Sequence, residues 1–427
     1  MTPGSQPLGF RRVDNALHVD GVALSAIADA VGTPSYVYSA NIVRARYARL
    51  AAAFQQVPHR IHYAMKANSS RGILLLLREC GAGVDIVSGG ELFRAQQAGF
   101  SGGDVVFSGV GKTVDEIGRA LDAQVQLINV ESEAELLTID AVAGQRNVVA
   151  SIAIRVNPEV TVDTPHAYIK TGEKGGKFGI PRDDVTRIAQ LARECAYVEL
   201  RGIGMHLGSQ IANADPMREA LPLLLELVER VHEQGHPLRF LDIGGGLSVP
   251  YTPEEAAPDV EGYADLVIAA TRPYGLQLLL EPGRYLVADA GTLLTRVLYR
   301  KHAAGKDFVV TDAGMNDLIR PALYQAHHEI EAVQQRAANI TADVVGPICE
   351  SGDFFAKGRV VPDVEAGDLL AIRTTGAYGY TMASHYNSRP RPTEVLVDDA
   401  RFAVVTEREL LEDLVRLEPS HPIWRSA

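Results

Sequence analysis

The sequence contains few cysteines and no long apolar run. Its 427 residues include three cysteines, Cys80, Cys195 and Cys349, which lie far apart along the chain. An odd number of widely spaced thiols disfavours a disulfide framework and fits a reducing compartment, so we expect a cytoplasmic protein. No apolar stretch approaches the ~20 residues that span a bilayer, and residues 1–14 lack a signal-peptide core. We therefore expect no association with a membrane.

An excess of positive charge is also missing. The formal net charge is -12, which argues against a general binder of nucleic acid or of anionic membranes. The hydrophobic content of 46% and the charged content of 22% are ordinary for a globular protein, so a disordered chain is excluded. A chain of this length has ample material for a large core and predicts two domains.

Short apolar runs that resemble strands recur along the first two thirds of the chain. They cover residues 61–65, 83–87, 105–108, 127–130, 152–156, 202–207, 240–243 and 278–280. Helix-like segments lie between most of them, for example at 90–98, 114–123, 132–142, 183–195 and 216–234. This alternation predicts parallel βαβ units with strands buried on both faces. Eight units are the number that closes a (β/α)8 TIM barrel, and an open doubly wound sheet is the alternative.

After residue 287, the alternation of strand-like and helix-like segments ends. Runs rich in β-forming residues follow, separated by Gly, Pro and Asp, and a short helix is expected at 408–417. We predict a (β/α)8 barrel over residues 34–286 and a second, mostly β C-terminal domain over 287–427. The lead-in of residues 1–33, with a small helix near 24–30, is expected to pack on this second domain.

Polar residues follow all eight predicted barrel strands. In a TIM barrel, the residues of the active site cluster at the C-terminal ends of the strands. Polar groups at every strand end contribute little to the stability of the barrel. Their presence at all eight ends therefore favours an active site, and hence an enzyme. These residues are Lys66, Asp85, Ser88, Ser108, Glu131, Arg155, Asn157, His206, Ser209, Gly244, Gly245, Gly246 and Glu281, the last followed by Pro282, Gly283 and Arg284.

Lys66 follows the first of these strands, in the stretch from His62 to Asn68. An ammonium held out of water loses stability or loses its proton, and a neutral lysine is a nucleophile for carbonyl groups. The aldehyde of pyridoxal phosphate is one such group. The alternative for Lys66 is a solvated strand end.

Three other strand ends also allow two interpretations. Gly244, Gly245 and Gly246 present backbone N–H groups to an anion or simply form a tight turn. His206 is either a core histidine or an imidazole lying against an aromatic ligand. Glu281 either pairs with Arg284 or faces a pyridine nitrogen and keeps it protonated. No spacing of His, Cys and Glu indicates a metal site.

Three clusters stand out in the predicted second domain. Arg320 and Tyr324 lie four residues apart, and a loop at 349–353 joins the Cys349 thiol to Glu350. A thiol beside carboxylates can serve as a proton donor. Tyr378 lies among glycines, and residues 386–392 follow. Each cluster alone is also compatible with a surface loop.

Together these motifs resemble the diaminopimelate decarboxylases, a branch of the fold-type III family of pyridoxal-phosphate enzymes that also includes ornithine decarboxylase and alanine racemase. The resemblance runs from about residue 34 to about residue 405. The motifs that carry it are Tyr63-Ala64-Met65-Lys66-Ala67-Asn68, Val87-Ser88-Gly89-Gly90-Glu91-Leu92, His206-Leu207-Gly208-Ser209-Gln210, Gly244-Gly245-Gly246, Glu281-Pro282-Gly283-Arg284, Cys349-Glu350-Ser351-Gly352-Asp353 and Tyr378 with Tyr386-Asn387-Ser388-Arg389.

The resemblance implies a role for each of these residues. Lys66 holds pyridoxal 5'-phosphate as a Schiff base, and Asp85 and His206 lie near the cofactor, His206 against its ring. Glu281 meets the ring nitrogen. The phosphate is bound by the glycine turn with Ser209, Gly283, Arg284 and Tyr378. Arg284, Arg320, Tyr324, Glu350 and Tyr378 hold the substrate. Cys349 is the proton donor and comes from the neighbouring subunit of a homodimer with shared active sites.

The implied reaction is the decarboxylation of meso-2,6-diaminopimelate to L-lysine and carbon dioxide, the last step of lysine biosynthesis. Diaminopimelate ends in an amino acid group, so its site needs a cation for the distal carboxylate and an acid for the distal ammonium. Arg320 and Glu350 supply that pair, and Arg–carboxylate contacts are strong and directional. The segment 164–172 also resembles this branch, although the family pattern is looser at 167–170.

Two rivals remain open. In the first, the substrate would be a different basic amino acid, such as ornithine, arginine or carboxynorspermidine. In the second, the chain would be a non-catalytic homologue that regulates a partner. Such homologues usually lose the lysine or the cysteine, and this sequence retains both Lys66 and Cys349.

Overall fold

A computed structural model describes residues 9–160, 166, 172 and 175–425. The chain divides into two compact units. One unit consists of residues 42–289, and the other combines residues 1–41 with residues 290–427. Within the described residues, no helix combines the length and the apolar character needed to cross a membrane.

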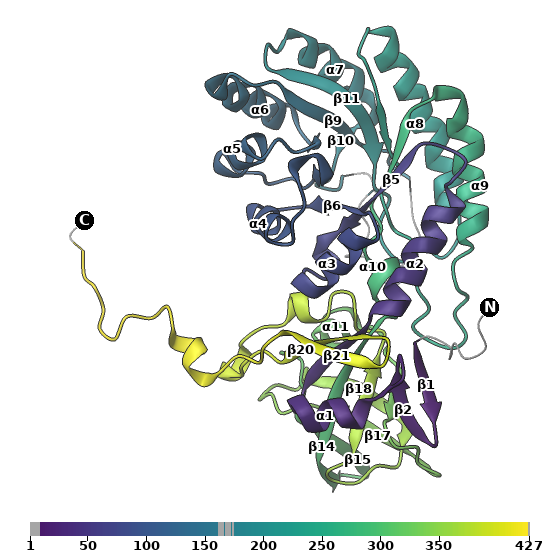
Figure 1. The fold of residues 1–427 in the computed structure, drawn as a ribbon, viewed down its shortest axis with the longest axis vertical. Coiled ribbons are helices and arrows are strands. Elements are labelled where there is room, and N and C mark those ends of the chain that lie inside the picture. Colours follow the sequence, from purple (N-terminus) through teal and green to yellow (C-terminus); the bar gives the residue numbers. More distant parts are fainter. Residues whose placement is uncertain (1–8, 161–165, 167–171, 173–174, 426–427) are drawn as a thin grey trace. The chain divides into compact units, whose positions relative to one another are not determined.

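The first unit is a closed barrel of eight parallel strands (Figure 1). In barrel order, the strands are β5 (His59–Ala64), β6 (Gly83–Ile86), β7 (Val105–Phe107), β8 (Leu127–Val130), β9 (Ala150–Asn157), β11 (Val198–Met205), β12 (Phe240–Asp242) and β13 (Gln277–Leu280). Pairing of β13 with β5 closes the ring. A two-residue strand, β10 (Ile180–Pro181), pairs with the end of β9. The expected TIM barrel is confirmed, with all eight predicted strands in place.

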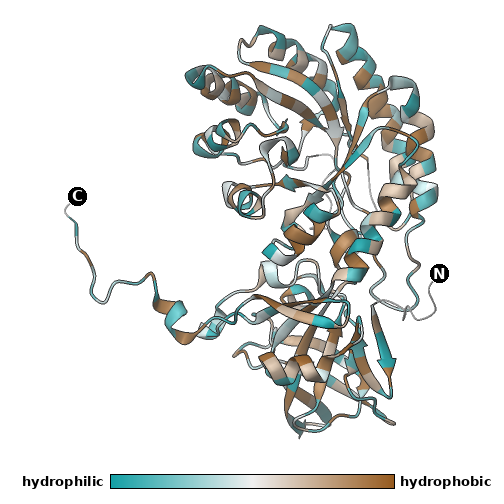
Figure 2. Ribbon diagram, in the orientation of Figure 1, coloured by the Kyte–Doolittle hydropathy of each residue, from teal (hydrophilic) through white to brown (hydrophobic). Residues whose placement is uncertain are grey.

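Helices follow the strands and surround the barrel. They are α2 (Ala40–Ala53), α3 (Arg71–Glu79), α4 (Gly89–Gln97), α5 (Val114–Asp122), α6 (Glu133–Arg146), α7 (Val185–Glu194), α8 (Asp215–Glu233) and α9 (Val260–Thr271). Hydrophilic and hydrophobic stripes run side by side on these helices (Figure 2), as expected for helices with one face on the barrel. Ser88, Thr113, Ser132 and Asp259 cap four of the helices with side-chain oxygens that accept backbone N–H groups.

Apolar side chains pack together inside the barrel. Val106, Leu127, Ala153 and Leu279 form one buried cluster, and Phe240 packs against it. These residues come from five different strands, so the interior is a packed core and not a pore. Polar side chains lie at or near the C-terminal ends of several strands, among them Asp85, Asn129 and Asp242.

The second unit is built on a mostly antiparallel sheet. Its path is β18 (Phe354–Pro362), β17 (Asn339–Val345), β15 (Lys306–Thr311), β14 (Gly291–Ala303), β4 (Ser35–Ser39), β20 (Thr393–Asp398) and β21 (Arg401–Thr406). Two further strands extend this sheet, since β19 (Leu369–Arg373) pairs with β14 and β16 (Ile330–Ala332) pairs with β19. The lead-in supplies β1 (Phe10–Val13), β2 (Ala16–Val19), β3 (Val22–Ala23) and α1 (Leu24–Val31). Leu17, Ile27, Leu294 and Val395 share one buried core, so the two ends of the chain pack together in this unit.

Two boundaries differ from the sequence prediction. Residue 34 was expected to begin the barrel, whereas β4 pairs with β14 and β20 in the second unit. The expected helix at 408–417 shortens to a 3-10 turn at Leu411–Val415, where Leu411 and Val415 are exposed. Without a surface on which to bury these side chains, this short segment lacks the tertiary packing that stabilises a longer helix.

Candidate active site

Lys66 and Asp85 face each other at the ends of neighbouring strands. Lys66 lies in a 3-10 turn, Met65–Ala67, directly after β5, and Asp85 is the third residue of β6. The Lys66 Nζ atom donates to Asp85 Oδ2 at 3.1 Å. The Asp85 side chain is fully buried, whereas that of Lys66 is 35% exposed. The ion pair therefore places an accessible amine over a buried acid at the barrel mouth.

His206 follows β11 and packs against the glycine turn. Its Nδ1 atom accepts the backbone N–H of Gly245, with 3.2 Å between the two nitrogens. Burial lowers the pKa of His206 well below its ordinary value, and the cations Lys66 and Arg155 lower it further. The imidazole is therefore neutral, and it carries its proton on Nε2.

Glu281 is a second buried acid, and it lies at the C-terminal end of the barrel strands. It follows β13, and burial raises its pKa well above the ordinary value, helped by the negative charges of Asp242 and Asp85. Its Oε1 atom accepts a long hydrogen bond from Ser108 Oγ at 3.4 Å. Glu281, Asp242 and His206 line a small cavity of about 10 Å³. Glu281 and Asp242 therefore line one cavity at the end of the barrel where Lys66 and Asp85 also lie.

The glycine turn has no room for side chains. A Cβ atom on Gly245 would lie 2.1 Å from the carbonyl oxygen of Glu281, and one on Gly244 would lie 2.6 Å from that of Met205. Gly244 and Gly246 also adopt positive φ angles of 68° and 102°. Glycine is therefore required at this turn for both steric and conformational reasons.

Arg284 is tied into the same face of the barrel. It begins the short helix α10 (Arg284–Val287) and is 6% exposed. Its guanidinium donates to Ser209 Oγ at 3.2 Å and to the hydroxyl of Tyr251 at 2.5 Å. A buried guanidinium beside the glycine turn adds positive charge where an anion would sit.

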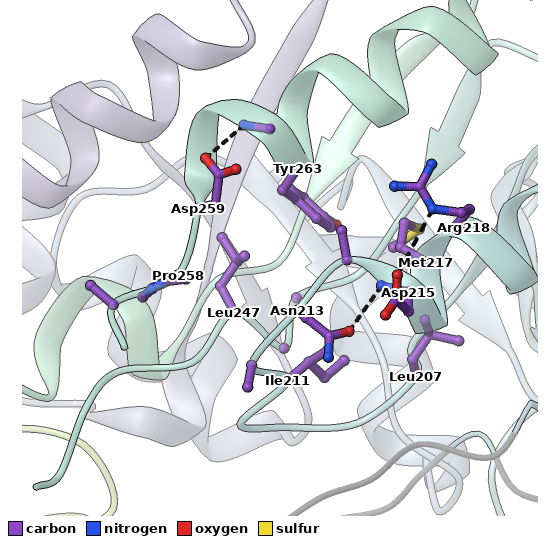
Figure 3. A pocket seen from close by; sticks show the side chains of 16 residues that line it. Leu207, Ile211, Asn213, Asp215, Met217, Arg218, Leu247, Pro258, Asp259 and Tyr263 are labelled. Carbon is purple, nitrogen blue, oxygen red and sulfur yellow. Dashed lines mark hydrogen bonds and ion pairs between the residues drawn. The ribbon is translucent and has the colours of Figure 1, made fainter. Parts of the chain in front are cut away.

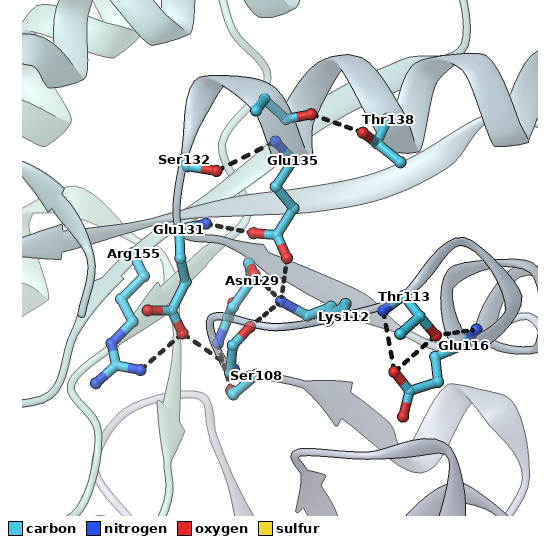
Figure 4. Close-up of polar contacts among 12 residues, drawn as sticks. Ser108, Lys112, Thr113, Glu116, Asn129, Glu131, Ser132, Glu135, Thr138 and Arg155 are labelled. Atoms are coloured by element: carbon cyan, nitrogen blue, oxygen red, sulfur yellow. Dashed lines mark hydrogen bonds and ion pairs between the residues drawn. The ribbon is translucent and has the colours of Figure 1, made fainter. Parts of the chain in front are cut away.

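A second polar network joins the ends of β7, β8 and β9 (Figure 4). Lys112 is 1% exposed, and its ammonium donates to Glu135 Oε1 at 3.0 Å and to the carbonyls of Gly109 and Asn129. Glu135 in turn accepts the backbone N–H of Glu131, whose carboxylate pairs with Arg155 at 2.8 Å. This chain of contacts fixes Arg155, a residue that lines the cavity of Glu281 and His206.

A larger cavity of about 350 Å³ lies on the outer side of the glycine turn (Figure 3). Gly245, Gly246 and Leu247 form one wall, and Met217 and Tyr263 project into it from α8 and α9. Ile211 donates its backbone N–H to the Gly246 carbonyl at 2.9 Å and so ties the loop before α8 to the turn. Hydrogen bonds to His206 and to Ile211 therefore hold the glycine turn in place.

The predicted site residues of the second unit contact other residues of the same unit. Arg320 begins α11 (Arg320–Tyr324), is 6% exposed and lies 3.2 Å from His328 Nε2 through its Nη1 atom. Cys349 is an exposed free cysteine, and its backbone N–H donates to Asn387 Oδ1 at 2.8 Å. Glu350 follows Cys349 and shares a side-chain hydrogen bond with Tyr386.

The remaining positions complete the comparison with the sequence prediction. Tyr324 ends α11, and Tyr378 has a positive φ of 56°. The structure brings Lys66, Asp85, His206, Ser209, Glu281, Gly283, Arg284 and the three turn glycines together in the barrel unit. Arg320, Tyr324, Cys349, Glu350 and Tyr378 belong to the second unit. The looser segment at 167–170 lies outside the described residues.

Sequence reasoning missed Asp242, Asn129 and Tyr251. Asn129 is a buried amide within an apolar strand, and it donates to Ser108 Oγ at 3.0 Å and to Asp242 Oδ2 at 3.4 Å. A polar residue in a strand buried on both faces is a signal that predicts a partner inside the barrel. Asp242 ends β12 two residues before the glycine turn, so the strand-end rule would also have found it.

These residues fit pyridoxal phosphate. The turn carries no side chains, so its backbone can lie close to a phosphate, and Arg284 is hydrogen-bonded to Ser209 on the same face of the barrel. Lys66 offers an amine to an aldehyde, and Glu281 offers an acid to a ring nitrogen. Asp85 Oδ1 is buried without a hydrogen-bond partner among the described residues, as expected where a polar ligand group would complete the site.

Comparison with known proteins supports this fit. The family model for the pyridoxal-binding domain of pyridoxal-dependent decarboxylases matches residues 40–288. Diaminopimelate decarboxylase from Pseudomonas aeruginosa is 48% identical over 95% of this chain and 97% of its own length. The crystal structure of diaminopimelate decarboxylase from Helicobacter pylori with L-lysine matches at 40% identity and a TM-score of 0.89, covering 92% of this chain and 99% of that one.

A more distant structure agrees over a similar length. Diaminopimelate decarboxylase from M. jannaschii, also in complex with L-lysine, is 35% identical with a TM-score of 0.92, covering 97% of this chain and 98% of that one. The match therefore includes both units and not the barrel alone. The chain belongs to the diaminopimelate decarboxylases, within the family of pyridoxal-dependent decarboxylases.

Proposed function

We propose that this protein removes one carboxyl group of meso-2,6-diaminopimelate as carbon dioxide and releases L-lysine, with pyridoxal 5'-phosphate as its cofactor. The full-length similarity to diaminopimelate decarboxylases carries this conclusion. The barrel site supports it with Lys66 facing Asp85 at 3.1 Å beside a glycine turn. This reaction would complete the biosynthesis of lysine.

The residues of the barrel hold and tune the cofactor. The glycine turn, whose backbone can approach an anion closely, would bind the phosphate together with Ser209, Gly283 and Arg284. Lys66 binds the aldehyde carbon, and the buried carboxylate of Asp85 keeps the amine oriented toward it. When bound, pyridoxal phosphate supplies an electron sink for the electrons that the departing carboxyl group leaves behind.

His206 would lie against the cofactor ring, and Glu281 would meet the ring nitrogen. His206 is neutral, so it presents a flat face without adding a positive charge near the ring. Glu281 holds a proton at the ring nitrogen, which strengthens the ring's capacity to accept electrons. Burial of the Glu281 side chain excludes water from its contact.

The residues of the second unit recognise the substrate. Arg320 binds the distal carboxylate and Glu350 the distal ammonium, with Arg284, Tyr324 and Tyr378 completing the contacts. Tyr378 also reaches the cofactor phosphate. Binding both distal groups fixes the orientation of the carboxyl group that leaves, so remote binding energy is used for geometry. The Cys349 thiol then gives a proton to the carbon that has lost its carboxyl group.

We further propose a homodimer in which Cys349 and Glu350 act in the site of the partner subunit. Cys349 is an exposed thiol whose loop is fixed by Asn387 and by Asp353, which accepts the backbone N–H of Ile348 at 2.6 Å. An ordered but exposed reactive side chain suits a site completed by another chain. A cytoplasmic location is also proposed, because Cys80, Cys195 and Cys349 are all free thiols.

The test pairs the spectrum of the cofactor with product formation. Purified protein should show the visible absorbance of bound pyridoxal phosphate and release carbon dioxide and L-lysine from meso-diaminopimelate. Lys66→Ala should abolish both the lysine-bound absorbance and turnover while the far-ultraviolet circular dichroism is retained. Lys306→Ala removes an exposed lysine of the second unit and serves as the matched control. Full activity in Lys66→Ala, or faster decarboxylation of ornithine or arginine, would refute the proposal.

A further inference from the structure

Asp242 and Glu281 form a pair of buried carboxyl groups within the barrel. Asp242 ends β12 and Glu281 follows the neighbouring strand β13, and they are 3% and 6% exposed. Their side chains share a hydrogen bond. Two ionised carboxylates accept hydrogen bonds but donate none, so this contact requires one proton within the pair.

The surrounding donors decide which carboxyl group carries the proton. Asp242 Oδ1 accepts the backbone N–H of Gly244 at 2.8 Å, and Oδ2 faces the amide nitrogen of Asn129 at 3.4 Å. Glu281 has the long contact from the Ser108 hydroxyl at 3.4 Å. Donors stabilise a carboxylate, so the negative charge belongs on Asp242 and the proton on Glu281. The contact between the two acids acts in the same sense, because it lowers the pKa of Asp242 and raises the pKa of Glu281.

Other charged and titratable groups face the pair from the elements around it. Asp85 on β6 raises the pKa of both acids, whereas Lys66 after β5 lowers that of Glu281. Tyr263 on α9 experiences the charge of Asp242. Arg155 on β9 and His206 after β11 line the same cavity. Asp85 is paired with Lys66, and a further negative charge on Glu281 beside Asp85 and Asp242 would be costly until a cation arrives next to it.

We propose that Asp242 is a positioning residue that keeps one shared proton on Glu281, and that this proton passes to the ring nitrogen when pyridoxal phosphate binds. The inference rests on pyridoxal phosphate being the cofactor of this site. In the transfer, the O–H bond of the Glu281 carboxyl breaks and an N–H bond forms at the ring. The negative charge remains on Glu281, opposite the newly formed pyridinium, so the site needs no proton from solvent.

The same aspartate connects the two ends of the cofactor site. Gly244 donates to Asp242 from within the turn that offers its backbone to the phosphate. One carboxylate therefore positions both the turn and the acid that meets the ring nitrogen. Replacing Asp242 by Asn preserves size but removes the negative charge that favours a proton on Glu281.

Proton counting during cofactor binding tests the proposal. Apoprotein is titrated with pyridoxal phosphate by isothermal calorimetry at neutral pH, in two buffers with different ionisation enthalpies. In Asp242→Asn, Glu281 has lost the negative charge that helps burial and Asp85 to keep it protonated, so the variant should take up more protons from solvent than the wild type, by as much as about one per site. Asp115→Asn, an exposed acid paired with Arg119 on α5, should match the wild type. Equal proton counts for Asp242→Asn and the wild type would overturn the proposal.

A second measurement needs only proteins with an intact Asp242. The infrared difference spectrum of the wild type should show that the band of a protonated carboxylic acid disappears when pyridoxal phosphate binds. Glu281→Gln should lack this band before and after binding. A band that persists in the wild type would overturn the inference, even if Asp242→Asn does not fold. Failure of the wild type to bind pyridoxal phosphate at all would instead contradict the proposed function.

Discussion

The imidazole of His206 accepts the backbone N–H of Gly245 through Nδ1, across 3.2 Å. This contact joins the residue expected beside the cofactor ring to the turn expected at the cofactor phosphate. It also fixes the tautomer, because only an unprotonated Nδ1 accepts a hydrogen bond. A protonated imidazole would lose this contact and would bring a positive charge toward Lys66 and Arg155.

His206 should therefore remain neutral through the pH range in which an ordinary histidine titrates. Its pKa is lowered well below the usual value of 6.5, first by burial and then by Lys66 and Arg155. Nitrogen-15 NMR should show the proton on Nε2 on both sides of pH 6.5. Loss of the signal in His206→Gln assigns it, and a resonance that titrates near 6.5 would contradict the prediction.

His62 should make the folded barrel less stable in acid. Its side chain is buried in β5, and burial, with a contribution from Arg60, lowers its pKa to about 4. Below pH 6.5 the unfolded chain binds a proton that the folded chain does not, so stability falls as pH drops from 6.5 to about 4. Such a shift corresponds to a loss of roughly 3 kcal/mol.

Urea unfolding of the wild type and His62→Gln at several pH values checks this effect. The variant keeps a polar group near Gln126, the partner of His62 at 3.2 Å, but has no imidazole to protonate. The stability difference between the two proteins should change between pH 6.5 and pH 4 and stay constant below that range. A constant difference at every pH would show that His62 does not contribute to acid sensitivity.

Lys112 should be important for stability although it lies away from the reacting groups. Its ammonium is 1% exposed and bonded to Glu135 and two carbonyls, so Lys112→Ala leaves a buried carboxylate without its cation. Breaking such a pair costs about 3–5 kcal/mol of unfolding free energy, measurable in urea. Arg119→Ala breaks an exposed pair on α5 and should change stability by less than about 1 kcal/mol. Similar losses in both variants would refute the role of Lys112 burial.

Arg320 should discriminate between substrates by their distal carboxylate. Arg320→Ala should lower kcat/KM for meso-diaminopimelate, relative to that for a substrate that lacks the distal carboxylate, by the value of one charge-assisted contact, roughly 2–3 kcal/mol. The kinetics of both substrates are compared after thermal unfolding has shown that the variant folds, because Arg320 also contacts the buried His328. Arg300→Ala, which breaks a pair with Asp363 in the same unit, is the control. Equal losses for the two substrates would assign Arg320 a role in folding only.

Complementation tests whether two chains share each site. Lys66→Ala and Cys349→Ala should each be nearly inactive, but mixed dimers would contain one site with both changes and one with neither. With random pairing, half of the dimers are mixed and half of their sites work, so about a quarter of wild-type activity should return. Mixing Lys66→Ala with the Lys66→Ala/Cys349→Ala double variant should restore nothing. No recovery in mixed dimers confirmed by mass spectrometry would place Lys66 and Cys349 on one chain.

The sequence alone determined the barrel and much of its polar rim. Parallel strands buried on both faces require nearly continuous apolar runs, so each of the eight strands is visible locally. The fold also places strand ends on one face, which makes Lys66, Asp85, His206 and Glu281 recognisable before their neighbours are known. Family motifs added the identity of the cofactor and the reaction.

Tertiary structure alone decided which of these groups meet. Residues 35–39 read locally as another buried strand, but pairing with β14 and β20, more than 250 residues away, assigns β4 to the second unit. Similarly, Asp242 and Glu281 are 39 positions apart in sequence, and only the lateral pairing of β12 with β13 places their carboxyl groups together. A local pattern reports how deeply a residue is buried, whereas its charge state depends on partners that long-range packing supplies.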